Sequence, residues 1–86
     1  SKQVLRCGTS IGANIKEAMH AQSRKDFISK MNIALKESYE TEYWLRLLNH
    51  TKYITDPEFD SIFAENQSVT NILAKIVITS KNSQEE

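Results

Sequence analysis

The stretch DFISKMNIALKESYETEYWLRLLNHT, from Asp26 to Thr51, decides the fold, because its twenty-six residues include neither Gly nor Pro. Nothing in it interrupts a helix, and at about 1.5 Å per residue it would form a rod of roughly 40 Å. Apolar and small residues recur at alternating spacings of four and three, the pattern of a helix buried along one side in a bundle. This predicted seam consists of Phe27, Met31, Ala34, Ser38, Thr41, Leu45 and Leu48.

A second apolar group, Ile33, Trp44 and Leu47, lies nearly opposite the seam when residues advance by about 100° each. Apolar residues on a face that stays in water do not stabilise a helix. We therefore expect this rod to be contacted from more than one direction. Glu37 and Glu40 form a polar track beside it, which is either an ordinary helix flank or a hydrogen-bonded contact. These five residues are our candidate interface between copies of the chain.

Toward the N-terminus, a first helix is predicted over residues 2–21, with one apolar face despite two glycines. Each glycine costs about 1 kcal/mol relative to alanine in a helix interior. Gly8 and Gly12 lie four apart on the apolar side, where they would admit another backbone at close range. We interpret them as a tight helix crossing in a bundle, since a GxxxG pair is a strong dimerisation signal only within membrane segments.

Toward the C-terminus, two short breaks separate the rod from its neighbours and predict antiparallel packing. Ser23 followed by Asp26 predicts the N-cap of a second helix over residues 24–52. Asp56 followed by Pro57 predicts the start of a third helix over residues 57–79, with Asp56 as N-cap and a frayed polar tail after it. With no strand signals, the chain is predicted to be an all-α, antiparallel up-and-down helical bundle in a single domain, residues 1–86.

Length and composition exclude several classes of protein. Eighty-six residues make one domain at most and bury a modest share of their surface, so assembly into oligomers is a common supplement. Eleven basic and eleven acidic residues cancel, so the whole molecule favours neither nucleic acid nor acidic ligands. The charge is nevertheless graded: residues 1–25 carry five basic residues and one acidic, and residues 56–86 carry six acidic and two basic.

The single cysteine, Cys7, cannot form an internal disulfide, and its apolar neighbours at helical spacing indicate a buried, reduced thiol. No signal peptide is visible, and no apolar run approaches the roughly eighteen residues of a membrane span. We therefore expect a cytoplasmic protein without membrane contact.

No motif in the sequence supports enzymatic chemistry. Glu17 and His20 match the Glu-x-x-His spacing of di-metal bundles, but such sites need a second copy and further carboxylates. Cys7 lacks a histidine on its own helix face, and His50 fits a role at the helix C-terminus. We predict a non-enzymatic protein with no cofactor, no metal and no small-molecule substrate.

A basic stripe on the first helix consists of Lys2, Arg6, Lys16 and His20. Three or four phosphate contacts would give weak, salt-sensitive binding, and no aromatic residue interleaves with them as a stacking platform. The alternatives are a solvated face, a phosphate contact with RNA, and docking on the acidic third helix of a neighbouring copy. The stripe is our candidate RNA or partner contact.

Two stretches together resemble the family of small bacterial bundles named after proteins encoded in intervening sequences of 23S ribosomal RNA genes. VLRCGTSIGANIKEA, residues 4–18, matches the family pattern R-x-G-x-S-I-x-x-N-I-x-E. SRKDFISKMNIALKESYETEYWLRLL, residues 23–48, matches K-D-F, I-A-x-x-E and E-T-x-x-W-L of the next helix. The two stretches cover about half of the chain.

The resemblance implies a four-helix bundle that assembles into a ring, often a pentamer, with no established biochemical role. A similar bundle is an accessory protein of diversity-generating retroelements, where a basic oligomer engages RNA and reverse transcriptase. Two departures stand out. Family members begin with one more helix than this chain has, so an N-terminal first helix is expected to be missing here. The neutral overall charge also differs from the basic accessory relatives. Our leading prediction is an oligomeric scaffold, and the alternative is an RNA-associated accessory protein.

Overall fold

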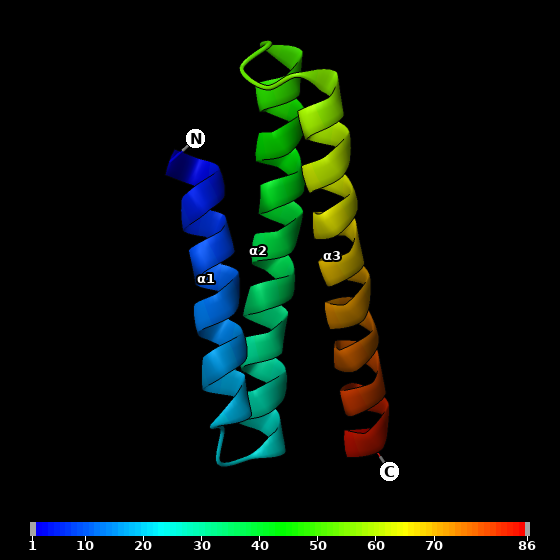
Figure 1. The fold of residues 1–86 in the computed structure, drawn as a ribbon. Helices are drawn as coiled ribbons and strands as arrows, with labels where there is room; N and C mark the ends of the chain where they lie inside the picture. The colour runs from blue at the N-terminus through cyan, green and yellow to red at the C-terminus, as the bar shows by residue number, and fades with distance from the viewer. Residues whose placement is uncertain (1, 86) are drawn as a thin grey trace.

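Three antiparallel helices make up the fold (Figure 1), as predicted from the sequence. They are α1 (Lys2–Met19), α2 (Arg24–His50) and α3 (Asp56–Glu85). The computed structural model describes the backbone of residues 2–85 and the side chains of residues 5–82. Within that part of the chain there is no strand, and no helix is long and apolar enough to cross a membrane.

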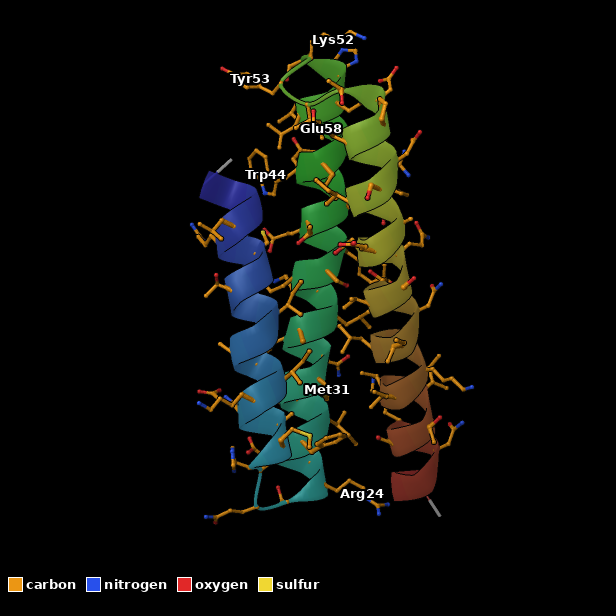
Figure 2. All side chains as sticks on the ribbon, in the orientation of Figure 1. Arg24, Met31, Trp44, Lys52, Tyr53 and Glu58 are labelled. Carbon is orange, nitrogen blue, oxygen red and sulfur yellow. The ribbon has the colours of Figure 1, made fainter. Side chains whose placement is uncertain are left out.

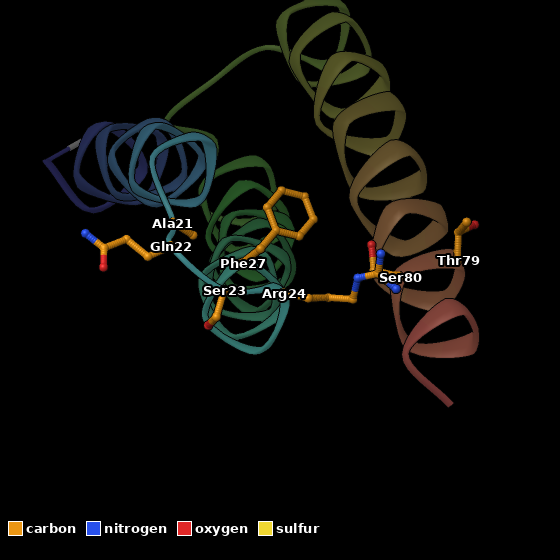
Figure 3. A pocket seen from close by; sticks show the side chains of 7 residues that line it. All are labelled: Ala21, Gln22, Ser23, Arg24, Phe27, Thr79 and Ser80. Carbon is orange, nitrogen blue, oxygen red and sulfur yellow. The ribbon is translucent and has the colours of Figure 1, made fainter. Parts of the chain in front are cut away.

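α1 and α3 each pack against α2, and within the described residues they do not pack against each other. α2 lies between α1 and α3 in Figure 1, and no described Cα atom of α1 comes within 8 Å of one of α3. The three helices form a body of 47 × 20 × 14 Å. Seen along its length, the body is V-shaped, with α2 at the apex (Figure 3).

The predicted seam of α2 forms the core. Met31, Ala34, Ser38, Thr41 and Leu45 are buried, and Phe27 and Leu48 are half-buried. α1 contributes Ile11 and Ala18 to the core cluster, and α3 contributes Leu73 and Val77. Ile28, which lies outside the predicted seam of α2, and Thr70 of α3 are also buried.

Both turns are closed by defined caps. Ser23 caps α2 as predicted, its Oγ accepting a hydrogen bond from the Asp26 backbone N–H at 3.1 Å. α2 ends at His50 in a Schellman motif: the N–H of Lys52 donates to Asn49 O, and that of Tyr53 to Leu48 O. Lys52 holds a φ of 68°, where glycine is the usual residue.

The start of α3 corrects our prediction of the N-cap. Thr55, and not Asp56, caps the helix: its Oγ1 accepts from the Glu58 N–H at 3.2 Å, and its own N–H donates to Glu58 Oε1 at 2.9 Å. This reciprocal pair is a capping box. Asp56 instead accepts a hydrogen bond from the Asn49 side chain at 2.9 Å, which ties the start of α3 to the end of α2.

The end of α3 is a second correction. We predicted a helix over residues 57–79 and a frayed tail, whereas α3 runs from Asp56 to Glu85. The tail contains neither Gly nor Pro, so no residue in it breaks the helix. The other predicted boundaries, residue 21 for α1 and residue 52 for α2, lie two residues beyond the observed ends.

Candidate functional site

The outer face of α2, defined by Ile33, Glu37, Glu40, Trp44 and Leu47, stays outside the core as its helical position requires. Ile33 and Leu47 are each 39% exposed, Trp44 is half-buried, and Glu40 is exposed. The Trp44 ring meets that of Tyr43 edge-on at a centroid distance of 5.3 Å. Figure 2 shows Trp44 projecting from α2 on the side of α1. This face is an aromatic and aliphatic surface that the described chain leaves partly uncovered.

The basic stripe on α1 is also exposed. Arg6, Lys16 and His20 are exposed, while the side chain of Lys2 lies outside the described residues. Lys16 and His20 form no ion pair among the described residues. Glu17 lies between them along the helix and pairs with Lys30 of α2, its Oε2 lying 3.2 Å from Nζ. This carboxylate therefore serves a contact between α1 and α2.

Cys7 is buried between α1 and α2. Burial raises the pKa of its thiol, and a hydrogen bond with the Thr41 side chain partly offsets that rise. A raised pKa keeps the sulfur protonated and poorly nucleophilic at neutral pH. No group of three or more metal-ligating side chains occurs among the described residues.

The polar residues of the seams are all satisfied, but most of them within their own helix. Ser38 Oγ donates to Leu35 O at 2.7 Å, and Thr41 Oγ1 donates to Glu37 O at 2.9 Å. Asn14 of α1 likewise bonds Ser10 O of its own helix. Asn66 differs: its Nδ2 donates across the seam to Ser38 O at 3.0 Å. Asn66 therefore fixes the register of α3 against α2.

The glycines of α1 do not make the close crossing that we predicted. A Cβ atom added at Gly8 or Gly12 would meet nothing within 4 Å, so no described part of another helix approaches them closely. Both glycines are exposed. Met19 and Leu5, which the helical pattern placed on or beside the apolar face, are more than 70% exposed. The apolar side of α1 is thus wider than its contact with α2.

A groove follows the side of α1 on which Gly8 and Ile11 lie. It runs between α1 and α3, with α2 as its floor, and Gly8, Thr41 and Val69 line it, one from each helix. Further hollows follow the same side of α3 past Ile72 and Ile76 to Thr79 and Ser80. At the end near the α1–α2 turn, the ring of Phe27 points into the space between α1 and α3 (Figure 3). The sequence signal for this groove is a second 3-4 repeat on α3, which consists of Ile62, Glu65, Val69, Ile72, Ile76 and Thr79.

Comparisons with known proteins add a family and a fold. The sequence model of the 23S rRNA-intervening sequence protein family matches residues 1–75. The chain is also similar to a crystal structure from Bacteroides thetaiotaomicron VPI-5482, described as a protein of unknown function from the S23 ribosomal protein family. That similarity has 58% sequence identity and a TM-score of 0.86, over 88% of this chain and 70% of the other. A comparison with curated proteins gave no match.

Proposed function

We propose that this chain, which belongs to the 23S rRNA-intervening sequence protein family, acts as a non-enzymatic scaffold that assembles with copies of itself. The similar Bacteroides protein is described as having an unknown function. The observation that carries this proposal is the outer face of α2. Its apolar residues repeat on the side of the rod away from the core, and the described chain leaves them partly uncovered.

Burial of that face supplies the physical reason for assembly. Removing apolar surface from water contributes about 25 cal/mol per Å². Aromatic residues are enriched at the centres of interfaces, and Trp44 with Tyr43 provides two adjacent rings. Glu37 and Glu40 flank the apolar residues and would form the polar rim. A ring, with five copies as the family resemblance implies, would use this face against a different surface of the next copy.

The experiment is a substitution that places one charge on the outer face of α2. Trp44→Glu should reduce the mass measured by light scattering to that of one chain, while circular dichroism retains most of the helical signal. Tyr53→Glu is the matched control, because Tyr53 lies in the α2–α3 turn and is 81% exposed. An unchanged mass for Trp44→Glu, or a monomeric parent protein, would contradict the proposal.

A second candidate function is contact with RNA through the basic stripe, favoured by the unpaired state of Lys16 and His20 among the described residues. In an oligomer, the stripes of several copies would together make several weak phosphate contacts with one RNA. Titration with a structured RNA at two salt concentrations tests it: three contacts predict a slope of log K against log salt of about −2 to −3. Absence of binding even at low salt removes this candidate.

A further inference from the structure

The side of α2 that lies opposite its buried seam carries a second regular pattern. Each member of the seam is preceded, two positions earlier, by a residue turned about 200° away from it around the helix. The spacings of these residues alternate between four and three, from the first turn of α2 to the last. We name this line the tyrosine stripe, and it consists of Lys25, Ser29, Asn32, Lys36, Tyr39, Tyr43, Arg46 and His50.

The composition of the tyrosine stripe differs from that of the rest of α2. Four of its eight residues are Lys, Arg or His, two are Tyr, and none is acidic, although the helix carries four acidic residues on its other sides. Asn32 is half-buried, and the other seven are exposed. Tyr39 and Tyr43 are 53% and 60% exposed. A line of positive charge, with two open aromatic rings in it, therefore follows the helix.

The cations of the tyrosine stripe are available to a partner outside the chain. Among the described residues, Lys25 and Lys36 form no ion pair or hydrogen bond. Arg46 donates a hydrogen bond to Glu42 Oε1 at 3.0 Å, which leaves the other N–H donors of the guanidinium open. The Phe63 ring, whose centroid lies 5.0 Å from Arg46 Cζ, helps to hold this side chain in place.

The two rings are spaced for bases that are not stacked on each other. Tyr39 and Tyr43 lie one helical turn apart, about 6 Å along the axis. Neighbouring stacked bases are separated by about 3.4 Å, so a strand that places one base on each ring must be opened between them. Unpaired strands can be opened in this way, whereas a duplex keeps its bases inside. Tyr43 meets the Trp44 ring edge-on, and such a contact occupies at most one of its two ring faces.

We propose that the tyrosine stripe binds single-stranded RNA, with one base stacked on each of Tyr39 and Tyr43 and with phosphates on Lys36 and Arg46. Lys36 precedes the first tyrosine by three residues and Arg46 follows the second by three, so the cations flank the rings. The two cations stand about 15 Å apart along the helix, a span of about three to five nucleotides.

The chemistry of the stripe selects this occupant over others. An acidic peptide would satisfy the cations but offers no flat bases to the tyrosines, and a duplex offers phosphates without accessible bases. The basic stripe of α1 has charge without rings, and the outer face of α2 has rings beside acidic residues. Among the described surfaces, the tyrosine stripe combines both features of a single-strand binding site. RNA is favoured over DNA because the tyrosine hydroxyls can bond the 2′-hydroxyl group.

The experiment measures binding of a labelled, unstructured RNA of about twelve nucleotides to the full chain by fluorescence anisotropy. The same RNA annealed to its complement, a DNA of the same sequence and a polyglutamate are the comparison ligands. The single-stranded RNA should bind at least about tenfold tighter than the duplex or the polyglutamate, and tighter than the DNA. Equal affinity for the duplex or the polyglutamate would overturn the proposal, and equal affinity for the DNA would overturn its assignment to RNA.

Substitutions of exposed side chains locate the site without disturbing the core. Tyr39→Leu and Tyr43→Leu should each weaken binding about fivefold or more, because each removes one stacking platform. Tyr39→Phe keeps the ring, so it should retain most of the affinity and reduce the preference for RNA over DNA. Tyr53→Leu is the matched control, since Tyr53 is 81% exposed but lies in the α2–α3 turn, and it should change nothing.

Charge variants separate this site from the two surfaces of the proposed function. Lys36→Gln should weaken binding and reduce the slope of log K against log salt by about 0.7, whereas Lys16→Gln on α1 should change neither. A loss of binding for Lys16→Gln but not for Tyr39→Leu, or an equal loss for Tyr53→Leu and Tyr39→Leu, would overturn the proposal. Circular dichroism checks that each variant keeps its helices. The scaffold proposal is tested by light scattering of Trp44→Glu without RNA, so each proposal can fail alone.

Discussion

The seam between α1 and α2 and the seam between α2 and α3 are built on different principles. Small and apolar side chains fill the first, with Ile11 and Ala18 packed near Met31 and Ala34, and the ion pair between Glu17 and Lys30 lies at its rim. The second has a polar centre, where Asn66 bonds the backbone of Ser38. Apolar packing is non-directional, whereas a hydrogen bond has one geometry. The first seam thus provides mainly burial, with a weak thiol contact between Cys7 and Thr41, and the second also specifies how the helices are aligned.

The substitution with the largest expected effect tests whether the seam between α2 and α3, despite its polar centre, depends on apolar burial. Leu73→Ala should lower the free energy of unfolding by about 2–5 kcal/mol, because it removes a buried side chain and leaves a cavity. Ile11→Ala applies the same change to the apolar seam and should cost a similar amount. Urea denaturation measures both. A loss of unfolding free energy below about 1 kcal/mol for Leu73→Ala would mean that polar contacts alone hold α3 against α2.

The next largest effect is expected from replacing two asparagines, one that bonds across a seam and one that bonds within its own helix. Asn66→Ala removes a hydrogen bond between helices, and Asn14→Ala removes one within α1. Both substitutions gain the same helix propensity, so the difference between their unfolding free energies compares the bond across the seam with a bond inside one helix. We expect Asn66→Ala to be less stable than Asn14→Ala by about 0.5–1.5 kcal/mol. Equal values in urea denaturation would show that Asn66 does not fix the register.

The two turns give a third test. Lys52 holds a left-handed backbone conformation in the α2–α3 turn, with a φ of 68°. Lys52→Gly should raise the free energy of unfolding by about 1 kcal/mol, because glycine adopts this conformation without a Cβ clash. Gln22→Gly is the control in the α1–α2 turn, where no described residue has a positive φ, and it should bring no gain. A loss of stability for Lys52→Gly would indicate that the lysine side chain stabilises the turn.

The smallest effect concerns the caps. Hydrogen bonds from the Thr55 backbone and then its side chain lower the pKa of Glu58 from its usual value of 4.5. A folded-state pKa below the unfolded one means that the contribution to stability is present above pH 4.5 and is lost as the pH falls through the folded value. The Ser23 cap of α2 accepts through a neutral hydroxyl and lacks this dependence.

Glu58→Gln is the variant that measures this contribution. Glutamine keeps an acceptor oxygen for the Thr55 N–H but does not titrate in this range. Thermal denaturation from pH 6 to about pH 3 should therefore show a shallower loss of stability for Glu58→Gln than for the parent protein. Identical pH profiles would exclude a role for the Glu58 charge in the cap.

Local signals in the chain determined the number, order and direction of the helices and the buried side of α2. Those features follow from residues close together in sequence: the spacing of Met31, Ala34 and Leu45, the absence of Gly and Pro, and the capping chemistry of Ser23. The N-cap of α3 was assigned one residue too late because Thr55 and Asp56 are both good capping residues, and only backbone geometry distinguishes them.

The tertiary structure alone decided which surfaces stay open. Helical periodicity places Gly8, Met19 and Ile72 on apolar sides, but it does not say whether another helix covers those sides. That depends on how α1 and α3 are placed around α2, which is a property of long-range packing. Asn66 shows the same limit: the sequence marks a polar residue in an apolar stripe, while its partner, the Ser38 carbonyl, lies twenty-eight residues away. A pattern specifies the faces of a helix, and packing specifies what each face contacts.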